Sequence, residues 1–324
     1  MYDLIIIGSG AAGFGAAIYA GRYRMKVLVI GKEFGGETAK AGMIENYPGF
    51  QSIDGFELMD AMKRQVTALH TELIDAEVTG IGKDEHCFQV AVGEKAYSAH
   101  GIIFATGAER RRLGLPNEKE LTGRGVHYCV TCDGPVYTDK TIALVGGGDA
   151  SVKGAVLAAE YVTKVFLIVR GKEVMAEPIN LERLKKLGDK IELLLETEVK
   201  EIIGTTRLEK IILSRELKGS PELIVDGLFV EVGAIPNVGL AKSLGVALDE
   251  RGYIKVDNMM QTNIDGVFAT GDAVNHFGSF KQDITAAATG AVAATSAYND
   301  RKIHGELCEY HLRPAVANKA KSDK

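Results

Sequence analysis

A glycine-rich turn between an apolar run and a helix-like segment occurs twice in this chain, 138 positions apart. The first copy follows residues 4–7 and reads Gly8-Ser9-Gly10-Ala11-Ala12-Gly13, a full GxGxxG pattern. The second copy follows residues 141–145 and reads Gly146-Gly147-Gly148, with Ser151 at the third glycine position. Turns of this kind bring backbone N–H groups and a helix N-terminus to the pyrophosphate of a dinucleotide. One copy is weak evidence, but two predict an α/β protein with two Rossmann-like dinucleotide-binding domains of three-layer ββα type.

Each glycine turn is followed by segments long enough for a helix and a second strand. After the first turn we expect a helix to about Tyr23 and a strand over residues 27–30. After the second turn we expect a helix from Asp149 to about Tyr161 and a strand over residues 165–169. Ser151 is small enough to permit the close helix–strand packing that the third glycine normally allows.

Three apolar segments that end in glycine indicate how the two domains are connected. They cover residues 101–107, 227–233 and 266–271. The first and third close one unit and the second closes the other, so the second domain is inserted into the first. The expected domains are 1–112 with 240–315, and 113–239, followed by a flexible tail over 316–324. The chain would cross at 109–111 and 234–237, and residues 88–92 and 208–213 would form antiparallel ribbons.

Composition excludes several classes of function. The chain has 324 residues and a net charge of −5, so it lacks the excess positive charge that binding to nucleic acid or anionic lipid requires. Residues 4–20 are interrupted by glycine and preceded by Asp3, so they read as a cofactor-binding unit rather than a signal peptide, and no membrane span is expected. Four cysteines do not make a secreted disulfide framework, which favours the cytoplasm.

Two of these cysteines, Cys129 and Cys132, form a CxxC motif followed by Asp133. A redox disulfide is the favoured interpretation, since nucleotide-binding motifs flank the pair. Zinc is the competitor, but a structural site needs four ligands and no second CxxC exists. Cys87 and Cys308 are solitary and are expected to be structural.

The residues beside the cysteines leave alternatives open. Asp133 either transfers protons to and from the thiols or caps a short turn before Gly134-Pro135. His127 either stabilises a thiolate or, as we favour, is an exposed strand histidine.

Two carboxylates are candidates for the cofactor of the first domain. Gly31 occupies the strand tip where an acidic ribose partner is expected, so Glu33, two residues later, is the candidate. Asp272 follows Ala269-Thr270-Gly271 and precedes an alanine-rich helix that starts near Ile284. Its carboxylate either binds a ribityl hydroxyl of a flavin or caps the helix.

In the second domain, Arg170 and Lys172 stand where an NAD-binding domain would carry an acid. This favours a 2′-phosphate, and therefore NADPH over NADH. The alternative is that both are solvated surface charges.

Taken together, these motifs resemble the low-molecular-weight thioredoxin reductases of bacteria and archaea, over nearly the whole chain to about residue 300. The resemblance implies FAD in the first domain, a pyridine nucleotide in the second, a homodimer, and thioredoxin as partner. It also implies that Cys132 faces the flavin, that Cys129 attacks the thioredoxin disulfide, and that Asp133 is the acid. The expected FAD contacts are Gly8, Ser9, Gly10, Ala12, Gly13, Glu33, Gly35, Gly36, Glu37, Asn46, Thr106, Gly107, Gly271, Asp272, Lys281 and Gln282. The expected nicotinamide-nucleotide contacts are Gly146, Gly148, Asp149, Ala150, Ser151, Arg170 and Lys172.

Three positions depart from the family pattern. Only Arg170 remains of an expected cluster of three arginines, Asp149-Ala150 replaces Asn-Ser, and Glu37 replaces Gln. Relatives with eroded nucleotide motifs take electrons from ferredoxin or a deazaflavin, which is the alternative donor here. A flavin oxidase or ferredoxin–nicotinamide reductase would need no CxxC, and a redox-sensing or zinc-binding protein is the non-enzymatic alternative. If flavin chemistry holds, the inserted domain is expected to swivel about its two crossings.

Overall fold

The computed structural model describes residues 1–84, 87–278 and 280–304. The expectations for Cys308 and for the tail 316–324 therefore lie outside the described residues. The chain forms two compact units, one from Met1–Gly107 together with residues from Pro236 onward, and one from Ala108–Ile235. These boundaries lie a few residues before the expected 112/113 and 239/240, because Ala108–Arg110 (β9) and Ala234–Pro236 (β18) pair as a two-stranded ribbon.

The first unit is built on a seven-stranded sheet with the order β5-β2-β1-β8-β7-β6, in which β19 also pairs with β8. The sheet is parallel where β1, β2, β5, β8 and β19 pair with one another. It is antiparallel where β7 pairs with β6 and with the other edge of β8. The bounds are β1 Tyr2–Ile7, β2 Val27–Gly31, β5 Glu72–Asp75, β6 Gly80–Lys83, β7 Phe88–Val92, β8 Lys95–Phe104 and β19 Val267–Ala269.

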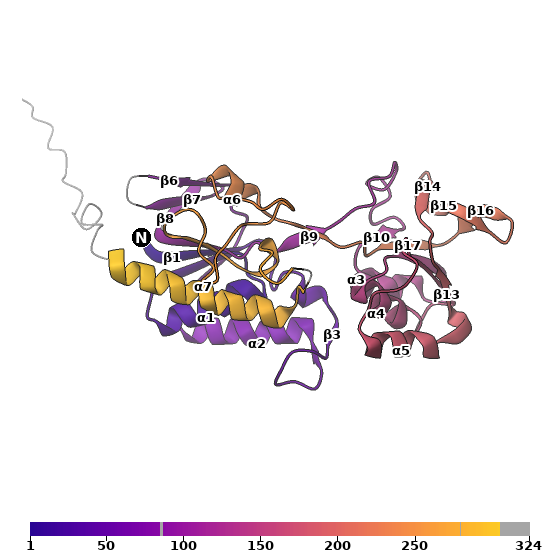
Figure 1. Ribbon diagram of the computed structural model, residues 1–324, viewed down its shortest axis with the longest axis horizontal. Helices are drawn as coiled ribbons and strands as arrows, with labels where there is room; N and C mark the ends of the chain where they lie inside the picture. Colours follow the sequence, from indigo (N-terminus) through magenta and orange to yellow (C-terminus); the bar gives the residue numbers. More distant parts are fainter. Residues whose placement is uncertain (85–86, 279, 305–324) are drawn as a thin grey trace, which may run out of the picture. The chain divides into compact units, whose positions relative to one another are not determined.

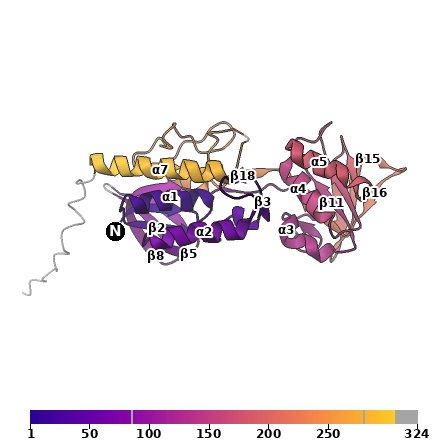
Figure 2. The same cartoon turned by 90° about the horizontal axis from the view of Figure 1, so that it is seen from below.

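Both faces of this sheet are covered, which explains why β1 is apolar at consecutive positions. Leu4 and Ile6 pack with the helices α1 (Ala11–Arg22), α2 (Gly55–Ala68) and α7 (Asp283–His304), as Figures 1 and 2 show. Ile5 and Ile7 pack on the opposite face with residues that include α6 (Gly239–Ser243). The smaller elements are η1 Thr38–Lys40, β3 Met43–Ile44, β4 Ile53–Asp54 and η4 Gly271–Ala273.

The second unit repeats this plan on a smaller scale. Its parallel sheet has the order β10-β17-β11-β12-β13, covered by α4 and α5 on one face and by the β14-β15-β16 ribbon on the other. The strands are β10 Val126–His127, β11 Thr141–Val145, β12 Lys164–Ile168, β13 Ile191–Leu194, β14 Val199–Gly204, β15 Leu208–Leu217, β16 Ser220–Ile224 and β17 Gly227–Val230. The helices are α3 Val130–Asp133, η2 Gly134–Tyr137, α4 Asp149–Ala158, α5 Pro178–Lys186 and η3 Gly188–Lys190.

The predicted fold class is confirmed: both units are Rossmann-like, and the second is inserted into the first. Both expected antiparallel ribbons are present, at β7 and β15. One helix is shorter than expected, because α4 ends at Ala158 and the N–H groups of Glu160 and Tyr161 bond back only three residues.

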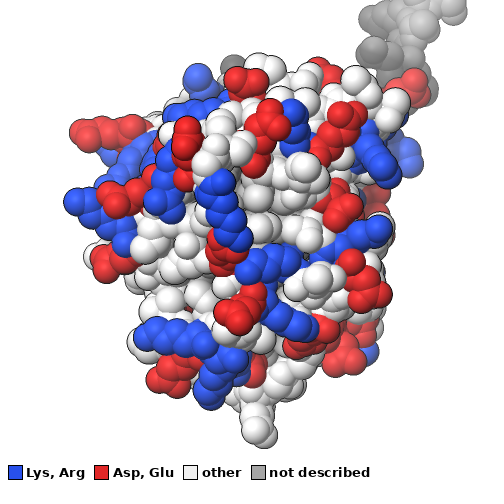
Figure 3. Space-filling view, turned by 90° about the vertical axis from the view of Figure 1, so that its right-hand side faces the viewer, with Lys and Arg blue, Asp and Glu red and all other residues white. Residues whose placement is uncertain are grey.

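Charge is mixed over the surface in Figure 3, where Lys and Arg are interspersed with Asp and Glu and no single-sign field forms. Within the described part of the chain, no helix is long and apolar enough to cross a membrane.

Candidate active site

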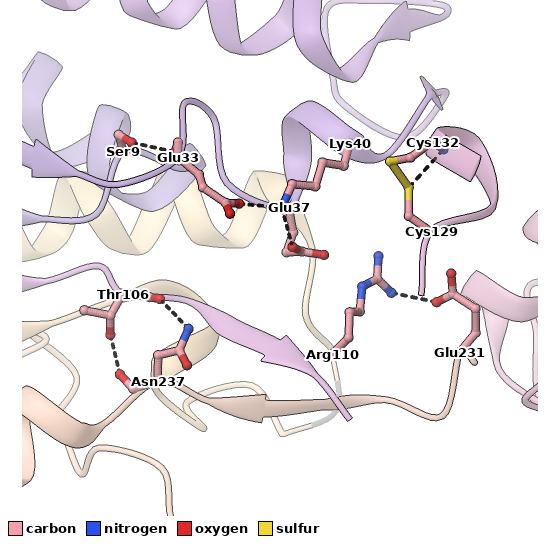
Figure 4. A network of polar contacts seen from close by, with 10 residues as sticks. All are labelled: Ser9, Glu33, Glu37, Lys40, Thr106, Arg110, Cys129, Cys132, Glu231 and Asn237. Atoms are coloured by element: carbon pink, nitrogen blue, oxygen red, sulfur yellow. Dashed lines mark hydrogen bonds and ion pairs between the residues drawn. A yellow bond between two sulfur atoms is a disulfide. The ribbon is translucent and has the colours of Figure 1, made fainter. Parts of the chain in front are cut away.

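Cys129 and Cys132 are joined by a disulfide at the start of α3 (Figure 4). Cys129 is the N-cap of this short helix, and its Sγ accepts a hydrogen bond of 3.1 Å from the backbone N–H of Cys132. After reduction, the same N–H can stabilise a thiolate on Cys129, since hydrogen bonds to a charged acceptor are the stronger kind. The CxxC segment is therefore built to alternate between disulfide and dithiol.

The side chain of Asp133 does not cap the following turn, which was one of its two expected roles. Its Oδ2 instead lies 3.2 Å from Nδ1 of His127. The interpretation of His127 as an exposed strand histidine is wrong: the residue is 8% exposed, because β10 is covered by η2. Its partners Tyr137 and Phe229 were not among the expected site residues.

The first glycine turn is shaped by close approach of the backbone. A Cβ at Gly13 would lie 1.9 Å from the carbonyl oxygen of Gly8, so only glycine lets α1 approach β1 this closely. Gly10 is different: its φ is −82°, and a Cβ there would meet nothing nearer than the Gly35 oxygen at 3.8 Å. Gly10 is also the N-cap of α1 and supplies no side-chain cap, so the first N–H groups of the helix are open to a phosphate.

The carboxylates near this turn are held by Lys40, which lies between Glu33 and Glu37 in Figure 4. The hydrogen bond and charge of Lys40 hold the pKa of Glu33 below its ordinary value, so this carboxylate remains ionised. The backbone carbonyl of Glu33 accepts a hydrogen bond from the buried Ser9 hydroxyl at 2.9 Å, which fixes the loop. Lys40 was not among the expected site residues.

Two further pairs involve expected flavin contacts and residues far away in the sequence; Asn237, in the second pair, was not among the expected contacts. Asn46 Nδ2 donates to Gln282 Oε1 at 2.9 Å, which links the loop before β4 to the start of α7. Thr106 Oγ1 donates to the carbonyl of Asn237 at 2.6 Å, and Asn237 Nδ2 donates back to the Thr106 carbonyl, as Figure 4 shows. Asn237 therefore fixes the Thr106-Gly107 turn.

Asp272 lines a pocket that also includes Gly271, Lys281 and Thr289. Burial raises the pKa of its carboxyl above the ordinary value of 3.8, which Lys281 opposes, while Asp283 and Glu37 add to the rise. Burial likewise lowers the pKa of Lys281. α7 begins at Asp283, which accepts a hydrogen bond from Thr38, so Asp272 is not the cap of this helix. A half-buried carboxylate that lines a pocket suits a hydroxyl-bearing ligand.

Replacing Asp272 with asparagine is expected to stabilise the flavin-free protein at neutral pH. Because the pKa of Asp272 is higher in the folded protein, its contribution to stability is full below pH 3.8 and is lost as the pH rises through the folded value. Asparagine does not ionise, so the variant does not lose stability in this way as the pH rises. Thermal unfolding of both flavin-free proteins at pH 4 and pH 7 checks it, and a variant that is less stable than the parent at pH 7 would contradict it.

The second glycine turn repeats the close packing of the first. A Cβ at Gly146 would lie 2.3 Å from the Glu231 oxygen, whereas a Cβ at Gly148 would meet nothing within 4 Å. Ser151 is fully buried and donates to the Gly148 carbonyl at 2.7 Å, in agreement with its expected packing role. The open N-terminus of α4 is thus available to a second nucleotide.

Asp149 occupies the first turn of α4, beside Ala150, which is exposed. Its Oδ1 accepts hydrogen bonds from Glu177 N at 3.0 Å and from Asn180 Nδ2 at 2.8 Å. The carboxylate therefore anchors the start of α5, a contact that sequence reasoning missed. It also leaves a negative charge where a pyrophosphate would bind. Arg170 and Lys172, by contrast, are both exposed at the end of β12.

Comparison with known proteins agrees with this arrangement. The Pyridine nucleotide-disulphide oxidoreductase family matches residues 2–294. The chain is 40% identical over 301 residues to the thioredoxin reductase of Mycolicibacterium smegmatis, covering 92% of this chain and 96% of the relative. It is 39% identical over 299 residues to that of Treponema pallidum, covering 91% and 96%.

Among solved structures, the thioredoxin reductase of Lactococcus lactis in its FR conformation superposes with a TM-score of 0.87 at 35% identity, covering 93% of this chain and 99% of the other. The redox disulfide, the two glycine turns and these matches agree with one another. The chain belongs to the pyridine nucleotide-disulphide oxidoreductases, enzymes that use a flavin and a pyridine nucleotide, and within them to the thioredoxin reductase family.

Proposed function

We propose that the protein is a thioredoxin-disulfide reductase that uses FAD and NADPH. The observation that carries this proposal is the Cys129–Cys132 disulfide, placed in the unit that holds the second nucleotide turn and followed directly by an acid. A bound flavin would supply the electron pair that opens this disulfide, drawn from a reduced nicotinamide.

The residues of the chain would then divide the thiol chemistry. Cys129 attacks the disulfide of thioredoxin, and Cys132 resolves the mixed disulfide, which restores the Cys129–Cys132 bond. Asp133 exchanges a proton with the thiols as they leave and attack. The assignment of Cys129 as the attacking thiol and Cys132 as the resolving thiol rests on the family resemblance. In the disulfide form Cys132 is the more exposed of the two.

The first unit fits FAD better than a mononucleotide. The open N-terminus of α1 at Gly10 suits a pyrophosphate, and the Asp272 pocket suits the hydroxyls of a ribityl chain. Glu33 is paired with Lys40 but stays ionised, so it can still accept a ribose hydroxyl. Asn46, Gln282 and Thr106 complete the cradle through the hydrogen bonds described above.

The electron donor is the point at which the chain departs most from its relatives. Arg170 and Lys172 favour the 2′-phosphate of NADPH, with NADH as the weaker donor. Asp149 disfavours the binding of both NADPH and NADH, because its negative charge lies in the first turn of α4, where their phosphates would bind. This carboxylate is the observation that favours the second candidate, the same dithiol chemistry with ferredoxin or a deazaflavin as donor.

Replacing Asp149 with asparagine is expected to tighten nicotinamide-nucleotide binding. Asparagine Oδ1 can still accept both hydrogen bonds from Glu177 and Asn180, so only the charge is lost. Repulsion between this carboxylate and a phosphate a few ångströms away is worth about 1 kcal/mol in water, which corresponds to a roughly fivefold change in Kd. Titration of NADPH and NADH into both proteins measures it. Arg170→Ala is the matched variant, expected to weaken NADPH and leave NADH unchanged.

The proposal as a whole is tested by mixing the anaerobic, FAD-loaded protein with NADPH or NADH and following the visible flavin band. Rapid bleaching by either establishes a nicotinamide donor. Bleaching by dithionite alone would instead support ferredoxin or a deazaflavin. Reduction of thioredoxin by the bleached protein tests the partner, and a protein that bleaches but leaves thioredoxin oxidised would overturn the proposed activity.

We also propose that the protein is a homodimer in the cytoplasm, as the family resemblance implies. A thiol-reducing enzyme works where the surroundings keep thiols reduced. Light scattering of the purified protein tests the dimer, and a mass near 34.8 kDa would contradict it.

A further inference from the structure

Two aromatic rings, those of Phe229 and Tyr137, enclose the imidazole of His127. The imidazole stacks on Phe229 with ring centroids 5.2 Å apart and an interplanar angle of 25°. Tyr137 packs edge-on against both His127 and Phe229, at 5.4 Å and 5.5 Å. Tyr137 itself is closely fitted, because a Cβ at Gly227 would lie 2.8 Å from its ring. The orientation of the imidazole is therefore fixed by packing on β17 and η2.

Each ring nitrogen of His127 has a polar partner. Nε2 lies 2.7 Å from the hydroxyl of Tyr137, and Nδ1 lies 3.2 Å from Oδ2 of Asp133. Burial raises the pKa of Tyr137, and the charges of Asp133 and Asp226 add to the rise, so the phenol keeps its proton at neutral pH. In the neutral imidazole the hydroxyl then donates to Nε2, which places the hydrogen on Nδ1, facing the carboxylate. The result is a continuous chain from Tyr137 through His127 to Asp133.

We propose that His127 is a positioning residue that holds Asp133 for proton exchange with the Cys129–Cys132 dithiol. The inference rests on the proposed function, in which Asp133 is the proton donor. When two electrons break the S–S bond, each sulfur becomes a thiolate. One of them takes up a proton that Asp133, whose side chain is open to solvent, relays from water, which leaves a thiol, a thiolate and the carboxylate of Asp133. Nδ1–H of His127 holds this carboxylate in place, and the proton returns to water by the same route when the thiol is reoxidised.

Among the described residues, few titratable groups face His127, so the effect of replacing it can be assigned to its contact with Asp133. Asp133 faces it from α3 and Tyr137 faces it from η2, while β17 presents the ring of Phe229. Asp226 lies beyond Tyr137 and accepts a hydrogen bond from the backbone N–H of Thr141.

The variants separate positioning from packing. His127→Phe keeps an aromatic ring against Phe229 and removes both hydrogen bonds. His127→Asn presents an amide N–H near the place of Nδ1 and cannot titrate. We expect His127→Phe to lower kcat for thioredoxin reduction at pH 7 by about tenfold, a part of the roughly 10²- to 10⁴-fold that a positioned acid supplies. His127→Asn should remain within about threefold of the parent, since it can still orient the carboxylate.

The decisive readout needs neither nicotinamide nor thioredoxin. Each protein is reduced with a phosphine, freed of it, and alkylated with iodoacetamide from pH 5 to pH 9. In the parent, the carboxylate that His127 holds beside the dithiol contributes to the pH at which the thiols become reactive. His127→Phe should move this inflection towards that of Asp133→Asn, whereas His127→Asn should leave it near that of the parent. In the Asp133→Asn background, adding His127→Phe should change kcat by less than about twofold, because the effect acts through Asp133.

The outcomes distinguish this inference from the proposed activity. If neither the parent nor any variant reduces thioredoxin but His127→Phe moves the alkylation inflection towards that of Asp133→Asn, the activity is wrong and the positioning role stands. If His127→Phe leaves both the alkylation profile and kcat unchanged, the positioning role is overturned. An additive loss in the double variant would also overturn it, because His127 would then act independently of Asp133.

Discussion

Replacement of Cys132 with serine is expected to abolish thioredoxin reduction while leaving the flavin bound. A serine hydroxyl cannot form the bond that joins Cys129 and Cys132, so the electron pair has no disulfide to enter. We expect kcat to fall by at least about 10³-fold, as for the loss of other covalent nucleophiles. Turnover with thioredoxin and the visible spectrum of the purified variant measure the two halves of the prediction.

Cys87 offers the matched control for that experiment. It is buried in the first unit, and its thiol donates to Asp84 Oδ2 at 3.3 Å, a hydrogen bond that a serine hydroxyl can replace. Cys87→Ser is therefore expected to leave turnover unchanged. Turnover retained in Cys132→Ser would show that the CxxC pair is not the route to thioredoxin.

The second large effect is expected from the first glycine turn, where two glycines serve different purposes. Alanine at Gly13 would place a methyl group 1.9 Å from the Gly8 oxygen, so α1 must move away from β1. Overpacking of this kind costs about 1–3 kcal/mol and occasionally more, and the displaced helix should also lose its flavin. Alanine at Gly10 meets no atom nearer than 3.8 Å in an allowed conformation, so the fold should persist.

The comparison of the two variants is the test. Gly13→Ala should lower both the Tm of the flavin-free protein and its flavin content. Gly10→Ala should keep the Tm and weaken only flavin binding, because its methyl group projects to the side that the pyrophosphate approaches. Equal loss of Tm in both variants would mean that Gly10 is a packing glycine and that the ligand lies elsewhere.

Most of the fold could be predicted because its signals are local. Residues 4–7 of β1 are all apolar because both faces of its sheet are covered, and the glycine turn follows them directly. The Cys129–Cys132 pair is equally local, since residues three apart at a helix start are close whatever the rest of the chain does. The ends of elements were less certain: α4 ends at Ala158 rather than near Tyr161.

The candidate site could be predicted only in part. The expected residues of the first unit come together, but the partners that orient them were missing. Lys40 between Glu33 and Glu37 is one example, and Asn237 at Thr106 is another. His127 was misread as exposed, because no local pattern in the sequence shows that Tyr137 of η2 covers it.

The sequence by itself therefore determined the two nucleotide-binding units, the insertion of one into the other, and the redox pair. The units and the redox pair follow from residue spacing within a few turns of chain, where backbone geometry leaves little choice. The insertion follows from the order along the chain of the apolar segments that end in glycine. Only the tertiary structure decided which side chains meet. Asn46 and Gln282 are 236 positions apart, Asp149 and Asn180 are 31 apart, and His127 meets Tyr137 across 10. Such contacts depend on strand order and on how each covering helix packs, and no local pattern in the sequence encodes these.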